Sequence, residues 1–187
     1  CRRTEAPASA PTYRWPTEIY TTGNLAGDTL QGDVIIKGYG NPDFREGDFR
    51  QLLQALRARG VRNIAGNFVI DKTYFSVPNQ GSIDGNEGAA YNALPEALLY
   101  NERGSCYEVR GKAGQIQRIC PIAPRNSNDL NANLFGDFWR IWVGEMGGRV
   151  GGGLQVAGLP SGAQLVHTHH STPLRNVIVE INKDSNN

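Results

Sequence analysis

Residues 28–40 read D-T-L-Q-G-D-V-I-I-K-G-Y-G, and their apolar run Val34-Ile35-Ile36 is bounded by glycines. It predicts a strand near residues 31–37, preceded by a strand in residues 13–22 and the tight connection G-N-L-A-G. The later run I-A-G-N-F-V-I-D, at 64–71, predicts another strand. Strands on both sides of a helical segment indicate a sheet covered by helices.

A helix is predicted between these strands, at about residues 48–59. Four apolar residues have the i, i+3, i+4, i+7 spacing of one buried helical face: Phe49, Leu52, Leu53 and Leu56. Asp48 is expected to be the N-cap, and Gly60 stands where a C-terminal glycine ends a helix.

A second helix and strand unit is predicted later in the chain, with its helix at about residues 133–146. The apolar stripe consists of Phe135, Phe138, Trp139, Ile141, Trp142 and Met146. Gly147 and Gly148 end it, and R-V-G-G-G-L-Q-V-A follows as a strand. We expect both tryptophans in the core and both helices on a common sheet with the strands near 31–37 and 66–71. The fold class is therefore α+β, a mixed sheet with packed helices.

Composition excludes two classes of partner. Nineteen basic and eighteen acidic residues give a net charge of +1, so the 187-residue chain lacks the basic face that nucleic-acid binding needs. The longest apolar runs are far shorter than the roughly 20 residues that span a bilayer, so no membrane span is predicted. Because Cys1 is an unusual first residue, we expect a processed or excerpted chain, led by a disordered segment at residues 1–12.

Two cysteines lie in alternating segments separated by K-A-G, which predicts a hairpin. If Ala113 is the centre of the turn, Cys106 and Cys120 lie directly opposite, at the Cα separation of about 4.5–5.5 Å that a disulfide can bridge. A bridge would imply an oxidising compartment, whereas two unpaired buried thiols remain the alternative. The chain contains no Cys-x-x-Cys, so neither a zinc site nor thioredoxin-like chemistry is indicated.

The last segment, S-T-P-L-R-N-V-I-V-E-I-N-K-D, predicts a third helix. Ser171 or Thr172 is expected to be its N-cap, and Pro173 its first helical residue. Its apolar face is predicted to consist of Leu174, Ile178 and Ile181, and Ser185 continues that face one turn further on. The chain then reads Ser185, Asn186 and Asn187, a Ser-x-Asn triplet.

Four runs occur in an order typical of one family. They are L-Q-G-D-V-I-I-K-G-Y-G-N-P-D-F at 30–44, L-R-A-R-G-V-R-N-I-A-G-N-F-V-I-D-K-T-Y-F at 56–75, Y-N-A-L-P-E-A-L-L-Y-N at 91–101, and H-S-T-P-L followed by I-N-K-D-S-N-N at the end. From Tyr13 to Asn187 the chain resembles the class C low-molecular-mass penicillin-binding proteins. These are periplasmic D-alanyl-D-alanine carboxypeptidase/endopeptidases of the penicillin-binding protein 4 type, with a β-lactamase/transpeptidase-like catalytic domain.

The resemblance implies which residues carry chemistry. That family builds its site from a Ser-x-x-Lys with the nucleophile, a Ser-x-Asn and a Lys-Thr-Gly, and Ser185 and Asn187 match the second motif. By resemblance, Ser185 would relay a proton and Asn187 would hold the substrate amide. The implied partners are peptidoglycan stem peptides and, in the complete enzyme, β-lactams. No cofactor or metal is implied, and the oligomeric state is not indicated.

The chain departs from the family pattern in two respects. After Ser9 come Ala10, Pro11 and Thr12, so no Ser-x-x-Lys is formed there. The chain has no Lys-Thr-Gly either. We therefore expect the 187-residue chain alone to be inactive.

The resemblance also implies a domain organisation. Residues 1–12 form the lead-in, 13–100 and 126–170 an accessory α+β domain, 101–125 a reduced β insertion, and 171–187 the edge of the catalytic domain.

Two other functional classes remain open. The chain could be a non-catalytic module that binds cell wall or a partner. It could instead be a nucleotide-binding α/β domain that uses G-Y-G-N-P-D at 38–43, although this loop lacks a third glycine and a Lys-Ser/Thr pair. The histidines 167, 169 and 170 are expected in a solvated loop, and Asp84 and Glu87 on the surface.

Overall fold

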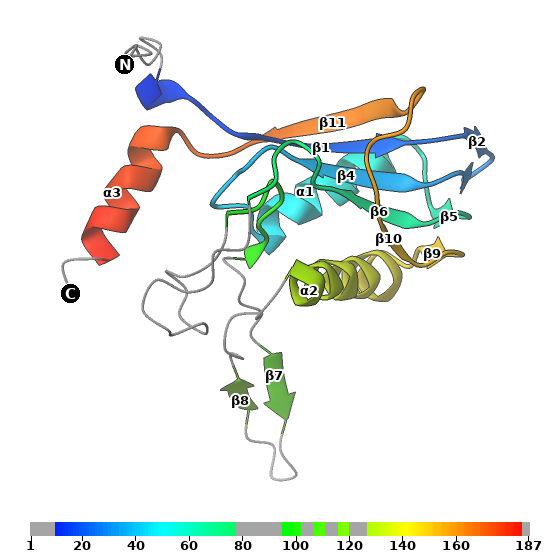
Figure 1. Ribbon diagram of the computed structural model, residues 1–187. Helices are drawn as coiled ribbons and strands as arrows, with labels where there is room; N and C mark the ends of the chain where they lie inside the picture. The colour runs from blue at the N-terminus through cyan, green and yellow to red at the C-terminus, as the bar shows by residue number, and fades with distance from the viewer. Residues whose placement is uncertain (1–9, 78–94, 102–106, 111–115, 120–126, 185–187) are drawn as a thin grey trace.

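The computed structural model describes residues 10–77, 95–101, 107–110, 116–119 and 127–184. The predicted fold class is confirmed: the protein is mixed α+β, with two mixed sheets and few helices (Figure 1). In the described ranges, no helix has the length and apolar character needed to cross a membrane.

The larger sheet has five strands in the order β10-β6-β4-β1-β11. The strands are β1 (Pro16–Thr21), β4 (Val34–Gly38), β6 (Phe68–Asp71), β10 (Leu154–Val156) and β11 (Gln164–His170). Strand β1 is antiparallel to β4 and β11, whereas β4, β6 and β10 are parallel to one another. The sheet therefore combines a parallel half with an antiparallel edge.

The chain also forms a smaller, four-stranded sheet, in the order β2-β3-β5-β9, and three of its strands directly precede strands of the larger sheet in sequence. Its strands are β2 (Asn24–Ala26), β3 (Thr29–Gln31), β5 (Asn63–Ile64) and β9 (Arg149–Val150). The passages 29–38, 63–71 and 149–156 thus each contribute one strand to each sheet. The predicted strands near 31–37 and 64–71 are present, but each of the two passages bends at a glycine and is divided between the two sheets.

The bends are stacked directly on one another. The N–H of Gly66 donates to the carbonyl of Gly32 at 3.1 Å, and the N–H of Gly152 donates to the carbonyl of Gly66 at 2.9 Å. These three positions form a continuous row of hydrogen-bonded backbone, which we call the glycine ladder (Gly32, Gly66, Gly152). It lets the three passages bend at the same level and remain hydrogen-bonded to one another on both sides of the bend.

The side chains beside the glycine ladder repeat the same contact. Asp33 Oδ1 accepts the N–H of Asn67 at 2.7 Å, and Asn67 Oδ1 accepts the N–H of Gly153 at 3.1 Å. A Cβ atom at Gly66 would lie 2.4 Å from Asp33 Oδ1, and one at Gly152 would lie 2.4 Å from Asn67 Oδ1. Both contacts are shorter than any van der Waals separation, so these positions require glycine.

Helix α1 (Glu46–Ala58) buries the predicted face. Phe49, Leu52, Leu53 and Leu56 are all inaccessible to solvent. The predicted N-cap is wrong: the helix begins after Arg45, and Asp48 lies at the third helical position, where its carboxylate accepts the Arg45 N–H at 3.0 Å. Asp48 thus supplies the reciprocal bond of a capping box, in which the side chain of the third helical residue accepts the N–H of the N-cap residue. An acidic residue at the start of a helix fits either position.

Helix α2 (Ser127–Trp139) continues directly into a π-helical segment, η4 (Arg140–Glu145). Phe138, Ile141 and Trp142 of the predicted stripe are inaccessible to solvent. Trp139, expected in the core, is 46% exposed. Phe138 stacks on Phe68 with ring centroids 4.2 Å apart, and the next residue along a helix points roughly 100° away, toward solvent.

Both helices pack on the same face of the larger sheet, as predicted. The ring of Phe68, on β6, contacts Phe49 of α1 at 6.1 Å between centroids and stacks on Phe138 of α2. Val34, Ile36 and Ile70 belong to the same buried cluster. This face therefore holds the main core.

A two-stranded hairpin separates α1 from α2 in sequence. Strand β7 (Tyr107–Arg110) pairs antiparallel with β8 (Ile116–Ile119), and Tyr107 lies opposite Ile119. The predicted hairpin is confirmed. Cys106 and Cys120 lie outside the described residues, so their disulfide stays a prediction.

The glycine ladder leads to a first prediction. Gly66→Ala should lower the free energy of unfolding by about 1–3 kcal/mol, because the new methyl group overlaps Asp33 and the Gly32 carbonyl. Urea denaturation followed by tryptophan fluorescence would measure this. Gly47→Ala is the matched control, since a Cβ there meets nothing within 4 Å and alanine favours the helix. Equal effects of the two substitutions would contradict the ladder.

Candidate functional site

The Ser-x-Asn triplet follows helix α3 (Leu174–Asp184) directly in sequence. The helix packs beside the N-terminal 3₁₀ turn η1 (Ala10–Thr12), apart from the layer of α1 and α2 (Figure 1). Ser185 and Asn187 themselves lie outside the described residues. The structure thus describes the element that leads to both predicted site residues, but not these residues themselves.

The amino end of α3 is tied to the chain before β1. Leu174 N–H donates to the Tyr13 carbonyl at 2.9 Å, and Ser171 N–H donates to the Trp15 carbonyl at 2.9 Å. The Ser171 hydroxyl accepts the Trp15 N–H at 2.9 Å. Arg14 Nη1 donates to the Ser171 carbonyl at 2.8 Å. We call this set of hydrogen bonds the latch (Tyr13, Arg14, Trp15, Ser171, Leu174).

The latch corrects the predicted start of the helix. The first carbonyl that accepts helical N–H groups belongs to Pro173, which bonds to Asn176 at 2.8 Å and to Val177 at 3.4 Å. Ser171 is therefore not the N-cap, because its hydroxyl bonds to Trp15 instead. Thr172 is not the N-cap either, since the helix starts after Pro173.

The predicted apolar face of α3 is also wrong in part. Val177 is 8% exposed, whereas Ile178 and Val179 are 48% and 51% exposed. Val177 therefore marks the buried side of the helix, and the side chain one position later points to solvent. The side chain of Ile181 lies outside the described residues.

A row of polar residues crosses the face of the larger sheet opposite the helices. Strand pairing places Thr168, Glu18, Lys37 and Asp71 side by side on β11, β1, β4 and β6. We call them the polar row. Sequence reasoning missed it, although Glu18 and Lys37 each interrupt an apolar strand pattern. The missing information was the register that aligns the four strands.

Glu18 is the acceptor for three hydroxyl groups. Tyr20 and Tyr39 donate to the same oxygen, Oε2, at 2.6 and 2.5 Å, and Thr168 donates to Oε1 at 3.3 Å. Burial, followed by the hydrogen bond to Glu18, raises the pKa of both tyrosines. Both phenols therefore stay protonated and act as hydrogen-bond donors.

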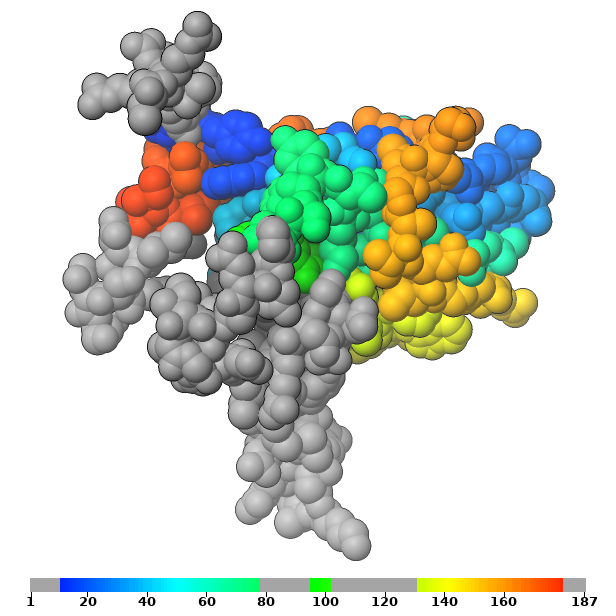
Figure 2. Space-filling model, viewed as in Figure 1, coloured from blue at the N-terminus to red at the C-terminus, as the bar shows by residue number. Residues whose placement is uncertain are grey.

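Asp71 is inaccessible to solvent and fully hydrogen-bonded. Its carboxylate accepts from Lys37 Nζ at 2.7 Å, from the Thr73 N–H at 2.8 Å and hydroxyl at 2.6 Å, and from the Leu159 N–H at 2.9 Å. Leu159 belongs to the segment between β10 and β11, which crosses this face of the sheet (Figures 1 and 2). Asp71 thus fixes that segment to the sheet.

The pKa of Asp71 follows from these bonds. Burial alone would raise it, but the hydrogen bonds from Lys37, Thr73 and Leu159 outweigh burial and lower the pKa below its usual value. The carboxylate is therefore a structural anion rather than a base for catalysis.

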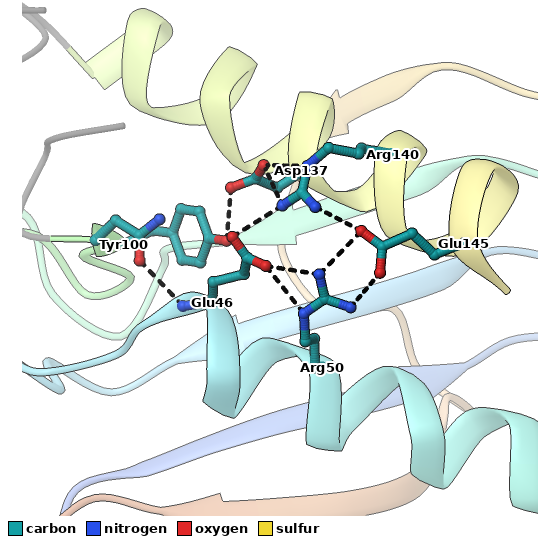
Figure 3. Close-up of polar contacts among 7 residues, drawn as sticks. Glu46, Arg50, Tyr100, Asp137, Arg140 and Glu145 are labelled. Atoms are coloured by element: carbon teal, nitrogen blue, oxygen red, sulfur yellow. Dashed lines mark hydrogen bonds and ion pairs between the residues drawn. The ribbon is translucent and has the colours of Figure 1, made fainter. Parts of the chain in front are cut away.

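A second charged cluster joins α1 to η4. Glu46, Arg50, Glu145 and Arg140 form a closed ring of alternating charges, which we call the charge ring (Figure 3). Arg50 bonds to Glu46 at 2.7 Å and to Glu145, and Arg140 bonds to Glu46 at 2.8 Å and to Glu145 at 2.6 Å. Burial opposes ionisation of Glu46, yet bonds from Arg50 and Arg140 lower its pKa.

Tyr100 and Asp137 extend the charge ring toward the core (Figure 3). Tyr100 donates to Asp137 Oδ2 at 2.8 Å, and Asp137 Oδ1 pairs with Arg140 at 3.0 Å. Burial, with the nearby Asp137 charge, raises the pKa of Tyr100. Because every charge in the cluster is paired within it, its role is to hold η4 against α1.

The glycine loop at 38–43 uses its backbone groups internally. Gly40 N–H donates to the Ala97 carbonyl at 2.6 Å, and Asp43 N–H donates to Asn41 Oδ1 at 3.0 Å. A Cβ at Gly38 would lie 2.2 Å from the Ala97 carbonyl oxygen. Packing against Ala97 explains Gly38, and a positive φ of 89° explains Gly40. The N–H groups of Gly40 and Asp43 are bonded within the protein, so they are not free to hold a phosphate.

The histidines lie in strand β11 rather than in the predicted loop. The side chain of His169 is 12% exposed, with Nε2 3.4 Å from Asp48 Oδ1. Burial lowers its pKa, against the effect of Asp48. Among the described residues, no group of three or more His, Cys, Asp or Glu could hold a metal ion. Asp84 and Glu87 lie outside the described residues.

Known proteins match this fold and sequence. Residues 10–127, more than half of the chain, match the profile of the D-Ala-D-Ala carboxypeptidase 3 (S13) family. The D-alanyl-D-alanine carboxypeptidase DacB of Haemophilus influenzae is 23% identical over 116 residues. That match covers 62% of this chain and 21% of DacB, so the chain spans only about a fifth of this curated relative.

Two solved structures share the fold. Penicillin-binding protein 4 (dacB) from H. influenzae has a TM-score of 0.71 at 17% identity, over 91% of this chain and 49% of the solved one. The same protein complexed with a novel β-lactam has a TM-score of 0.63 at 16% identity, over 91% and 47%. The chain thus corresponds to about half of these solved chains.

Asp71 provides the second prediction. Because its pKa is lower folded than unfolded, its stabilising effect is present above the unfolded carboxyl pKa of about 4 and is lost as the pH falls. Asp71→Asn should lower the free energy of unfolding by about 3–5 kcal/mol at pH 7, and less below pH 4.

Denaturation from pH 3 to pH 7 would measure this, with the exposed Asp28→Asn as control. A constant difference between wild type and Asp71→Asn across that range would contradict the assigned ionisation.

Proposed function

The chain belongs to the D-Ala-D-Ala carboxypeptidase 3 (S13) family, and from this membership we propose that it is part of a serine-type D-Ala-D-Ala carboxypeptidase/endopeptidase. The family match confirms the resemblance seen in the sequence. The enzyme would trim or uncrosslink peptidoglycan stem peptides through an acyl-enzyme. The match of residues 10–127 is the observation that carries this proposal.

Ser185 and Asn187 are the proposed site residues of this chain. A serine that attacks an amide needs a neighbour to take its proton, and the departing amine needs a proton returned. The Ser185 hydroxyl would relay that proton. The Asn187 amide would donate to a substrate carbonyl and accept from a substrate N–H, and so hold the peptide in line for attack.

The nucleophile and the Lys-Thr-Gly strand are not among these 187 residues. We propose that other parts of the protein supply them, which agrees with the short share of each relative that the chain covers. Residues 13–100 and 126–170 would form an accessory domain, with 101–125 as its insertion. Residues 171–187 would form the edge of the catalytic domain.

The proposed location is the periplasm, where cell-wall stem peptides are accessible. The solved relative in complex with a β-lactam supports β-lactams as acylating ligands of the complete enzyme. A non-catalytic, wall-binding module is the second candidate, favoured by the missing Ser-x-x-Lys.

The third prediction tests the role of the triplet. In a gene product that holds this chain together with a Ser-x-x-Lys and a Lys-Thr-Gly, Ser185→Ala should slow acylation by a labelled penicillin by about 10² to 10⁴. Asn187→Ala should weaken substrate binding as well as turnover. Stopped-flow acylation and thermal melts would separate these effects from unfolding.

Ser161→Ala is the control, because residue 161 is exposed in the segment between β10 and β11. Incubation of the 187-residue chain with the same penicillin should give no covalent adduct by mass spectrometry. An adduct on this chain would refute its predicted inactivity, and unchanged acylation in Ser185→Ala would contradict the proposed role of Ser185.

A further inference from the structure

The latch replaces strand pairing at the point where β11 ends. The last paired residues of β1 and β11 are Pro16 and His170. One residue further, Ser171 N–H still bonds to the Trp15 carbonyl, as in an antiparallel ladder. The Trp15 N–H would next require a carbonyl, but the chain turns away toward Pro173 and the Ser171 hydroxyl accepts that N–H instead.

Every polar group of Ser171 is used in this way. Its side chain is nearly inaccessible, with the residue 3% exposed. Its hydroxyl also donates to the Thr172 carbonyl at 2.8 Å, and its own carbonyl accepts Arg14. A buried hydroxyl with both a donor and an acceptor partner has a positional role, not that of a nucleophile.

Geometry makes the direction of α3 sensitive to the latch. Eleven residues at 1.5 Å each give a helix about 16 Å long. A rotation of about 10° at its amino end would therefore move its far end by about 3 Å. Ile178 and Val179, in the middle of the helix, are exposed.

We propose that Ser171 is a positioning residue for the Ser-x-Asn site, with Arg14 as its support. This rests on the proposed function, in which Ser185 and Asn187 act at the end of α3. The Ser171 hydroxyl and the Arg14 guanidinium hold the start of β1 and the end of β11 together. They thereby fix the direction in which α3 leaves the larger sheet. A shift of about 1 Å in an active-site group can lower a rate by about 10²-fold.

The first arm of the test measures direction alone, on the 187-residue chain. Spin labels at Gln54 and Val179, both exposed, report the distance between α1 and α3 by pulsed electron resonance. Wild type should give one narrow distance, and Ser171→Ala should broaden or shift it. Thr172→Ala, at the neighbouring exposed residue, should leave it unchanged. An unchanged narrow distance in Ser171→Ala would overturn the proposal.

The second arm measures acylation in the gene product with all three motifs. Ser171→Ala should slow penicillin acylation by about 10- to 10²-fold, mainly through the rate constant of the chemical step. If Ser171→Ala does not fold, Arg14→Gln should give the same direction of change, and Arg14→Lys should recover part of the rate.

The two arms separate the possible failures. If Ser185→Ala has no effect on acylation but Ser171→Ala still broadens the distance, the proposed function is wrong and the latch remains. Acylation at the wild-type rate in both Ser171→Ala and Arg14→Gln would overturn the positioning role.

Discussion

The fold depends on the close approach of three backbone passages at the glycine ladder. Gly32, Gly66 and Gly152 bend their strands at the same level, and the N–H groups of Gly66 and Gly152 bond to the carbonyls of Gly32 and Gly66. A side chain at Gly66 or Gly152 would occupy the space of the carboxylate or amide beside it. One narrow contact therefore lets the same passages form two sheets without losing backbone hydrogen bonds.

The bend also decides which residues share a face. After it, Phe68 and Ile70 of β6 point to the helices, whereas Val69 and Asp71 point to the opposite face. The helix side becomes an aromatic core around Phe68. The other side receives the polar row, in which Asp71 must find bonds for both oxygens. The core and the polar row are thus two consequences of one register.

Much of the fold could be predicted from the sequence, because the patterns that indicate its helices and hairpin are local. The spacing of Phe49, Leu52, Leu53 and Leu56 identifies a buried helical face without knowledge of its partner. The hairpin follows likewise from alternation around one turn. The bend at Gly66 does not, because the groups that crowd this position, Asp33 and the Gly32 carbonyl, lie 33 and 34 residues away in sequence.

The residues whose environment was predicted wrongly also depend on contacts with parts of the chain that are distant in sequence. Trp139 and Ile178 fit helical stripes, but a stripe does not say where the covering element ends. Ser171 has the sequence context of an N-cap, yet its hydroxyl accepts the N–H of Trp15, 156 residues earlier in sequence. The charge ring needs α1 beside a π-helical segment, which no local pattern predicts.

In the proposed function, the Ser-x-Asn triplet acts with a Ser-x-x-Lys and a Lys-Thr-Gly, neither of which occurs in these 187 residues. Under this proposal, the latch directs the triplet, because the Ser171 hydroxyl holds the amino end of a helix about 16 Å long that leads to it. The sheet edge would then influence the chemistry without contacting the substrate, because an error in direction grows along the helix.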